Sequence, residues 1–398
     1  MATLENNQNK KPKRRSSPLK RNRRLQGKYL SWLLIGCIVL CLATGFVVKD
    51  REFSDSENRR LAQWPEFSLS AILDGSYLNG MGDYIADQFP GRDGWITLNL
   101  KLNQLLGQKE SSGVYLCEDG YLMQIPAEPN AVQHERNLKA INTFYQNHSD
   151  LNMVMVVSPN AVTVHADKLP LHAPVRDQVA DLYHIASTVN GVKVVDVTQT
   201  LKAHSDEYLF YRTDHHWTSL AAYYAFQTFA PELEITAPSL DEYTIYPVST
   251  TFEGTLSSKS GSHSALDTVE IMVPKSGIEY YVTYNSDNNT NICSLYNRAA
   301  LDVKDHYTVF FGGNYSRVDI TTTANTERNL LIFKDSYANC LVQFLYPYFD
   351  HITMIDPRYY YDNVEHVITS RGITDVLFLY NADTFLGDTS LADVLVSE

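Results

Sequence analysis

The stretch LLIFKDSYANCLVQFL, residues 330–345, decides the fold class of this chain. Residues 330–333 are a short apolar run typical of a buried strand, and residues 334–336 are predicted to form a turn. The apolar residues that follow recur at the i, i+3, i+4 and i+7 spacing of one helix face: Ala338, Leu341, Val342 and Leu345. A buried strand that leads at once into a helix is the repeating element of an α/β protein.

The same alternation extends in both directions from this stretch. On its C-terminal side the predicted elements are a strand at 352–355, a helix at 364–368 that stops at Gly372, and a strand at 376–380. On its N-terminal side they are a helix at 137–146, a strand at 153–157, a helix at 179–187 and a strand at 192–197. The predicted fold class is therefore α/β, a parallel sheet with helices on both faces.

Two other regions flank or interrupt the predicted α/β domain, which spans residues 111–398. Residues 50–110 are predicted to be a juxtamembrane segment, mostly helical and polar. Residues 235–325 are rich in Ser, Thr, Asn, Gly and Tyr and break the alternation, so we expect a polar insertion or cap there. A hairpin around Asp119 and Gly120 is expected near the start of the domain.

The first fifty residues differ from the rest of the chain. Residues 1–28 are a basic tail in which the segment from Lys10 to Lys28 holds ten Lys or Arg and no acid. Residues 29–48, YLSWLLIGCIVLCLATGFVV, carry no charge, and as a helix they would span roughly 30 Å, the thickness of a bilayer's hydrocarbon core. The sequence predicts a single membrane span, with the N-terminus in the cytoplasm and the C-terminal domain outside the cell membrane.

A cleaved signal peptide is the alternative interpretation of this region. Ala43, Thr44 and Gly45 are small enough for a cleavage site. The apolar run is longer than a usual signal peptide's, and the basic segment before it is long. Both features favour an uncleaved anchor.

Charge and cysteine content limit the class of partner. After residue 50 the chain carries 22 Lys and Arg against 44 Asp and Glu, which argues against nucleic acid and anionic membrane surfaces as partners. A neutral or amphiphilic substrate fits better. Three cysteines lie beyond the predicted anchor, an odd number that implies no full disulfide framework: Cys117, Cys293 and Cys340. No CxxC spacing indicates zinc, and no cofactor is predicted.

Polar residues follow the predicted strands at their carboxyl ends, where parallel sheets bind ligands. Ser336, Asp356, Arg358 and Asn381 follow strands of the C-terminal half. In the N-terminal half, a further predicted strand leads into the tetrapeptide DHHW at 214–217. We expect these residues to converge at one edge of the sheet.

A serine at a sharp strand-to-helix turn is a candidate nucleophile, and Ser336 occupies such a position. Its alternative role is that of a helix N-cap. A nucleophilic serine needs a base held by a carboxylate, and His216 with Asp214 supplies both from one loop. The alternatives are a structural His–Asp pair, or a metal site of Asp214, His215 and His216 that lacks another well-spaced ligand.

Other polar and aromatic residues are candidates for binding substrate. The Asn381 amide could donate to an oxyanion, although an asparagine there is more often a turn residue. His215 is predicted to be structural or to face the substrate. Five aromatic residues could form a sugar-stacking wall, or could equally belong to the core and its rim: Tyr211, Trp217, Tyr337, Tyr359 and Tyr360.

The segments FKDSYANCLVQFL and TDHHW together resemble the DHHW protein family. More broadly they resemble the SGNH-hydrolase-like domain of the alginate O-acetylation proteins, in which a DxHW element precedes the nucleophilic serine. The segments ENRRLAQWPEFS and DQFPGRD are similar to the ENR-x-L and D-x-FP-x-R elements of that group. The resemblance covers most of residues 51–398 and implies an SGNH-hydrolase-like, flavodoxin-like fold with a circularly permuted motif order.

Carried over by position, the resemblance assigns Asp335 and Ser336 to the serine block and Asn381 to the asparagine block. Asp214 and His216 match the acid–base block. Two departures are visible. Lys334 replaces the usual glycine before the Asp-Ser pair, and residues 355–358 lack the glycine that lends an oxyanion N–H. Arg358 could substitute for that glycine electrostatically.

The resemblance implies a serine-dependent O-acetyltransferase or carbohydrate esterase with a Ser336–His216–Asp214 triad. The implied substrate is a cell-envelope polysaccharide outside the membrane, and a multispanning membrane acyltransferase is the candidate acetyl-donating partner. The alternative is a non-catalytic glycan-binding or assembly factor that keeps the same scaffold. A metal-dependent hydrolase is a third, weaker hypothesis.

Overall fold

The computed structural model describes residues 26–36, 39, 48–54, 56–57, 59–285, 291–292 and 294–396. The chain forms two compact units, one of Met1–Ser54 with Arg59–Trp95 and the other of Asp55–Asn58 with Ile96–Glu398. Most of the predicted basic tail at 1–28 and half of the predicted anchor at 29–48 lie outside the described residues. Among the described helices, none combines the length and apolar character that a bilayer crossing requires.

The first unit holds short elements organised around one carboxylate. Its elements are β1 (Phe53–Ser54), β2 (Arg59–Arg60), α2 (Leu69–Leu73) and α3 (Ser76–Asp87), and α4 (Arg92–Leu105) begins in it. Asp87 accepts hydrogen bonds from both terminal nitrogens of Arg59 and from the Ala62 N–H. The Arg59 hydrogen bonds lower the pKa of Asp87 to about 2, so this ion pair persists at neutral pH.

The second unit is built on an eight-stranded sheet with the order β11-β10-β12-β14-β13-β15-β6-β7. Five neighbouring strands are parallel: β14 (His351–Ile355), β13 (Asn329–Lys334), β15 (Asp375–Asn381), β6 (Asn152–Ser158) and β7 (Lys193–Val195). Three strands continue the sheet antiparallel at one edge: β12 (Arg317–Thr322), β10 (Tyr280–Asn285) and β11 (Asn291–Ile292). The predicted α/β class is confirmed, and the sheet, predicted to be parallel, is mostly parallel with an antiparallel extension at one edge.

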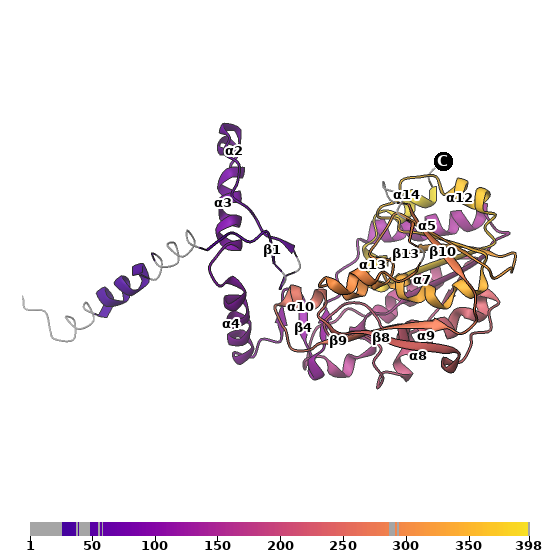
Figure 1. The fold of residues 1–398 in the computed structure, drawn as a ribbon, viewed down its shortest axis with the longest axis horizontal. Coiled ribbons are helices and arrows are strands. Elements are labelled where there is room, and N and C mark those ends of the chain that lie inside the picture. Colours follow the sequence, from indigo (N-terminus) through magenta and orange to yellow (C-terminus); the bar gives the residue numbers. More distant parts are fainter. Residues whose placement is uncertain are drawn as a thin grey trace, which may run out of the picture. The chain divides into compact units, whose positions relative to one another are not determined.

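Helices cover both faces of this sheet (Figure 1). On one face lie α5 (Ala131–Asn147), α7 (Gln178–Thr188), α12 (Val364–Arg371) and α14 (Leu391–Val396). On the other lie α8 (Thr198–Ala203), α9 (Ser219–Phe229) and α11 (Tyr337–Leu341). Within β13, Leu331 and Phe333 pack against the helices of the first face, and Leu330 and Ile332 pack in the core on the other face. Because both faces are buried, the parallel strands read as continuous apolar runs in the sequence.

The connections around β13 create the place where a ligand site is expected. Strand β14 follows β13 in the chain and pairs with it on one side, whereas β15 pairs with it on the other. The strand order therefore reverses at β13, and open α/β sheets bind ligands beyond the carboxyl ends of their strands at such a position. Phe333 is in register with both Ile355 and Phe378, so the residues that follow these strands share one edge.

Two predicted features differ from the structure. The residues before Asp214 are not a strand of the sheet; they belong to a loop between α8 and α9, in which Phe210 and Trp217 form an isolated antiparallel bridge. The segment 280–322, expected within an insertion, extends the central sheet through β10 and β12 instead. Polar and apolar residues alternate in these antiparallel strands, so the strands do not form the continuous apolar runs that mark the parallel part of the sheet.

Within the predicted insertion at 235–325, one part forms a sheet separate from the central sheet. Strands β8 (Tyr243–Phe252) and β9 (Asp267–Pro274) form a separate two-stranded sheet, followed along the chain by the extension just described. The helix α10 (Thr255–Ser260) lies between these two strands in sequence. The expected hairpin around Asp119 is present as β4 (Val114–Leu116) and β5 (Leu122–Gln124), which join β3 (Glu110–Ser111) in a third sheet.

Candidate active site

Ser336, His216 and Asp214 form a continuous chain of hydrogen bonds. Ser336 Oγ lies 2.7 Å from His216 Nε2, and His216 Nδ1 lies 2.5 Å from Asp214 Oδ1. An ionised carboxylate can only accept, so Nδ1 carries the ring hydrogen and Nε2 accepts from the serine hydroxyl. Asp214 is 2% exposed and His216 is 7% exposed, so water competes little for these bonds. This is the geometry in which an imidazole can remove a proton from a serine.

The Ser336 side chain is not a helix cap, which was the alternative for this position. Ser336 occupies the N-cap position of α11, but its hydroxyl makes no capping hydrogen bond. Its backbone already has helical angles, with φ of −68° and ψ of −17°. The neighbouring carboxylate takes the cap's place, because Asp335 Oδ1 accepts from the Tyr337 N–H at 2.8 Å. The hydroxyl is thereby left to face His216.

Two aromatic side chains join the loop of His216 to the turn of Ser336. Trp217 Nε1 donates to the carbonyl oxygen of Tyr337 at 3.0 Å, and the Tyr337 hydroxyl donates to the carbonyl oxygen of His215 at 2.7 Å. Both side chains are 0% exposed. These reciprocal bonds hold together two segments that are 120 residues apart in the chain, and they fix the serine–imidazole distance.

Tyr307 supports the imidazole from a third segment. Its ring stacks on that of His216 with centroids 3.7 Å apart and an interplanar angle of 12°. Its hydroxyl donates to the carbonyl oxygen of Ser336 at 2.8 Å. One buried tyrosine therefore restrains both the base and the turn that carries the hydroxyl.

Asp214 is held by four donors. Oδ1 accepts from His216 Nδ1 and from the His216 backbone N–H, and Oδ2 accepts from the backbone N–H and the hydroxyl of Thr255. Burial alone would raise the pKa of Asp214, but the adjacent imidazoles and these hydrogen bonds outweigh it and hold the pKa well below its usual value. Asp214 is therefore an anion throughout the neutral range and can stabilise a positive charge on His216.

Gly254 allows the backbone before Thr255 to approach Asp214. A Cβ at position 254 would lie 2.3 Å from the Asp214 Cβ and 2.5 Å from its Oδ2, well inside contact distance. We expect Gly254→Ala to displace Asp214 and to lower the kcat/KM for an acetyl ester by about 10²-fold, the cost of a 1 Å misplacement. Steady-state turnover of p-nitrophenyl acetate measures the loss.

Gly387→Ala is the matched control for this substitution. A Cβ there meets nothing within 4 Å and the glycine ends the short helix α13 (Ala382–Gly387). We expect that control to keep its activity. Equal activities of the two variants would show that the tight approach of Gly254 to Asp214 does not matter.

Asn381 lies at the predicted edge but is committed to other partners. Its Nδ2 donates to Asp335 Oδ2 at 2.6 Å and to Thr384 Oγ1 at 2.7 Å, while its backbone N–H also donates to Asp335 Oδ2. Its Oδ1 caps α13 by accepting from the Thr384 N–H. Both amide hydrogens are thus used, so the expected oxyanion donor is engaged in fixing Asp335 and the start of α13.

Asp335 is fully buried directly beside the serine. Burial raises its pKa to about 6, and the N–H groups of Asn381 and Tyr337 oppose that shift. Its carboxylate accepts from the turn that carries Ser336 and from the end of β15, so it ties these two strand ends together. We assign it a structural role in shaping the turn.

Lys334 and Arg358 form a second charged cluster behind the turn. Lys334 Nζ donates to Asn339 Oδ1 at 2.8 Å and lies 3.8 Å from Asp356 Oδ2. Burial lowers the pKa of Lys334 to about 8. Arg358 donates through Nε and Nη2 to the two oxygens of Asp356, at 2.8 and 2.6 Å. Arg358 was predicted to lend a positive charge to the oxyanion. In the structure that charge is paired with the buried carboxylate of Asp356.

Of the five aromatic residues predicted as a possible sugar-stacking wall, four are buried and cannot stack on a sugar. Tyr359 is 49% exposed, but the others are at most 3% exposed and pack in the two cores: Tyr211, Trp217, Tyr337 and Tyr360. These four side chains are buried and offer no open ring face to a sugar. These four residues therefore have the alternative role, packing in the core.

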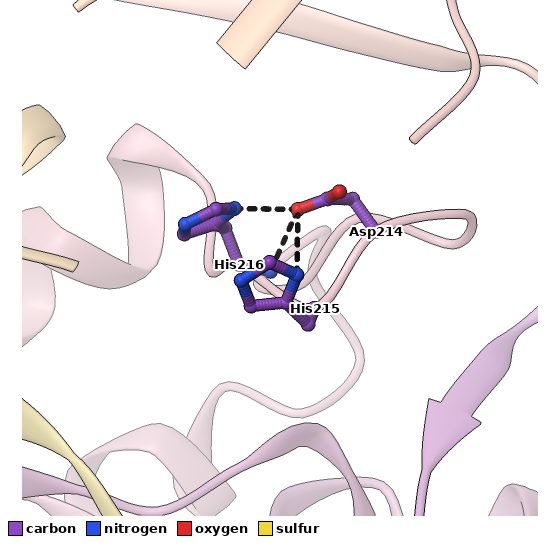
Figure 2. A group of neighbouring side chains, drawn as sticks. All are labelled: Asp214, His215 and His216. Atoms are coloured by element: carbon purple, nitrogen blue, oxygen red, sulfur yellow. Dashed lines mark hydrogen bonds and ion pairs between the residues drawn. The ribbon is translucent and has the colours of Figure 1, made fainter. Parts of the chain in front are cut away.

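Asp214, His215 and His216 are also the described group that comes nearest to a metal site (Figure 2). One ligand atom from each lies within 4.8 Å of the others. However, His216 Nδ1 is hydrogen-bonded to Asp214, and His215 Nδ1 lies 2.8 Å from Thr255 Oγ1. A metal bound through these two Nδ1 atoms would have to break both contacts, and the residues as they lie form a hydrogen-bonded site.

Thr255, Tyr307 and Gly254 are site residues that the sequence did not reveal. Thr255 and Gly254 lie 41 and 40 positions after Asp214, in a segment with no apolar periodicity. Tyr307 is one of 26 tyrosines in the chain. A glycine beside a threonine was the available local signal, and it is too common to be informative.

Comparison with known proteins gives one family and a set of related folds. The family model described as DHHW protein matches residues 57–120 and 133–355. No curated protein matches the chain at a significant level. The crystal structure of a DHHW family protein from Eubacterium siraeum is 26% identical, with a TM-score of 0.62 over 72% of this chain and 95% of that one.

Two further solved structures match the chain at lower identity. Bacillus cereus PatB1 with a sulfonyl adduct is 22% identical, with a TM-score of 0.60 over 71% of this chain and 97% of that chain. The O-acetyltransferase domain of Pseudomonas putida AlgJ is 14% identical, with a TM-score of 0.44 over 72% of this chain and 99% of that domain.

Proposed function

The chain belongs to the DHHW protein family, and from this premise we propose that it is a serine-dependent acyltransferase or esterase that acts on a cell-envelope polysaccharide. The observation that carries the proposal is the 2.7 Å contact between Ser336 Oγ and His216 Nε2, with Asp214 bonded to the opposite ring nitrogen. A serine, an imidazole and a buried carboxylate in this order are the requirements for acyl transfer.

In the proposed first half-reaction, Ser336 Oγ attacks the acyl carbon of the donor while His216 Nε2 takes the hydroxyl proton. The tetrahedral intermediate expels the donor's leaving group, which receives that proton from His216. Ser336 is left esterified. Asp214 keeps the Nδ1–H in place throughout and stabilises the transient imidazolium.

In the second half-reaction an acceptor hydroxyl attacks the esterified carbonyl and gives its proton to His216. Collapse of the second tetrahedral intermediate releases Ser336 Oγ, which recovers the proton. A sugar hydroxyl as acceptor yields an acetylated polysaccharide, and water yields esterase activity. No metal or cofactor is needed for either half-reaction.

The oxyanion of each intermediate needs a hydrogen-bond donor close to Ser336. The backbone N–H of Ser336 has no acceptor among the residues that are described, so it is available for this role. Asn381, to which the resemblance assigns a second donor, would have to release Asp335 or Thr384 first. The proposed oxyanion site therefore relies first on the Ser336 N–H.

The polysaccharide substrate and the location are proposed from sequence and resemblance. The motif order Asp214–His216 before Ser336 matches the circularly permuted SGNH-like domain of the alginate O-acetylation proteins. Residues 29–48 are proposed as a single-pass anchor with the catalytic domain outside the cell membrane. Because acetyl donors are cytoplasmic, a multispanning membrane acyltransferase is the proposed partner that delivers the acetyl group.

A sulfonyl fluoride tests the nucleophile directly, and PatB1 is described with a sulfonyl adduct. We expect phenylmethanesulfonyl fluoride to add one sulfonyl group to the full-length protein, with loss of fluoride, and peptide mapping to place it on Ser336. Ser336→Ala should take up none, and His216→Ala should react at least about 10²-fold more slowly, since it loses the base. Equal labelling of the wild type and Ser336→Ala would reject the proposal and favour a glycan-binding factor.

A further inference from the structure

The two adjacent imidazoles of the site are arranged as a pair (Figure 2). The rings of His215 and His216 have centroids 3.9 Å apart and an interplanar angle of 36°. Both turn Nδ1 toward the same atom, Asp214 Oδ1, at 3.7 Å from His215 and 2.5 Å from His216. Each ring therefore presents its Nε2 on the side away from Asp214, as Figure 2 shows.

Thr255 decides which nitrogen of His215 carries the hydrogen. The Thr255 hydroxyl lies 2.9 Å from Asp214 Oδ2, and it must donate there because an ionised carboxylate can only accept. Its one hydrogen is then used, so Thr255 Oγ1 accepts from His215 Nδ1 at 2.8 Å. In the neutral ring the hydrogen is on Nδ1, and Nε2 is left with a lone pair.

Nε2 of His215 is open to a ligand. The His215 side chain is 33% exposed, against 8% for His216, and its Nε2 has no partner among the residues that the structure describes. Burial of the ring, together with the neighbouring His216, lowers the pKa of His215 to about 4. The ring is therefore neutral near pH 7, and Nε2 accepts a hydrogen bond rather than donating one.

We infer that His215 Nε2 binds a second hydroxyl of the acceptor, next to the hydroxyl that His216 deprotonates. The acceptor class that fits is a vicinal diol, as in a pyranose ring, since two accepting nitrogens on adjacent rings match two hydroxyls on adjacent carbons. During transfer the attacking hydroxyl loses its proton to His216, whereas its neighbour keeps its proton and donates a hydrogen bond to His215. This inference rests on the proposed function.

The test compares two small acceptors of similar size. Ethylene glycol is a vicinal diol, and in 2-methoxyethanol a methyl group replaces one of the two hydroxyl hydrogens. With p-nitrophenyl acetate as donor, the ratio of acetylated acceptor to free acetate measures how the acyl-enzyme divides between alcohol and water. This ratio does not depend on how fast the acyl-enzyme forms, so it isolates the acceptor step.

In the wild type we expect the ratio to be about 3- to 10-fold higher for ethylene glycol than for 2-methoxyethanol, once the two equivalent hydroxyls of ethylene glycol are allowed for. A difference of this size is the effect of one neutral hydrogen bond. His215→Asn keeps a donor to Thr255 but has no atom at the Nε2 position, and it should abolish the preference. His215→Gln brings an amide oxygen close to that position and should restore part of it.

Two results would overturn the inference: equal ratios for the two acceptors in the wild type, or an undiminished preference in His215→Asn. Sulfonyl labelling of Ser336 in each variant shows that the site is still assembled. If the wild type releases no nitrophenolate above background, the proposed function itself fails, and the acceptor site fails with it. These outcomes are distinguishable because nitrophenolate reports acylation and the ratio reports only deacylation.

Discussion

Replacing Ser336 with alanine should remove turnover of p-nitrophenyl acetate almost completely, with a loss in kcat/KM of about 10³-fold or more. Among the described residues, the Ser336 hydroxyl is the one hydrogen-bond partner of His216 Nε2, at 2.7 Å, and alanine leaves His216 without a proton to accept. The substitution removes one oxygen atom and no capping bond, because the Ser336 side chain does not cap α11. We therefore expect the melting temperature to change little, so that the loss reflects chemistry.

Ser187→Ala is a suitable control for this loss. Ser187 is an exposed residue of α7 whose hydroxyl donates to a carbonyl of its own helix, so the variant should keep full activity. If Ser336→Ala retained more than a tenth of the wild-type rate, another nucleophile would have to be sought. If the wild type itself were inactive yet bound glycan, and the variant bound equally well, the non-catalytic alternative would stand.

The sheet could be predicted because its central strands are buried on both faces. Strands β13 and β15 are flanked by helices on each side, so every residue from Leu330 to Phe333 had to be apolar. The carboxyl-end positions of Ser336 and Asn381 follow directly from those runs. The antiparallel edge was missed since β12 mixes polar residues such as Asp319 and Thr321 with Val318 and Ile320.

The position of the Asp214 loop could not be predicted in the same way. The loop follows no strand of the sheet, and it reaches Ser336 through Trp217 and Tyr337, whose bonds run to backbone carbonyl oxygens. Such bonds leave no spacing in the sequence, because any residue has a carbonyl. The resemblance groups Asp214 and His216 with Ser336, and the structure brings these three side chains into hydrogen-bond contact, but that contact depends on tertiary packing.

Asn381 illustrates how one residue type supports two functions. An asparagine after a buried strand can donate to an oxyanion or can cap the next helix, and both uses place it at the same position. Its partners, Asp335 and Thr384, decide in favour of the structural use. Thr384 is the third residue after Asn381, the spacing of an N-cap bond, and this was the local signal for that role.

Asp214→Asn should lower kcat/KM by about 10³- to 10⁴-fold, although the side chain keeps its size. Four donors converge on the two oxygens of Asp214, and an asparagine offers one oxygen and one NH₂ group. With the NH₂ toward His216, Nδ1 must accept, so the ring hydrogen moves to Nε2 and the imidazole can no longer take the Ser336 proton. In either orientation the NH₂ group faces a buried backbone N–H, that of His216 or that of Thr255, which costs about 1–3 kcal/mol.

The two orientations of that asparagine predict different signatures. Turnover of p-nitrophenyl acetate and the rate of sulfonyl labelling should fall together if the His216 tautomer changes. Faster labelling than in that case would identify the second orientation, in which His216 Nδ1 still donates to an oxygen. Activity within tenfold of the wild type would contradict both, because it would mean that His216 does not need a carboxylate at Nδ1 to act as the base.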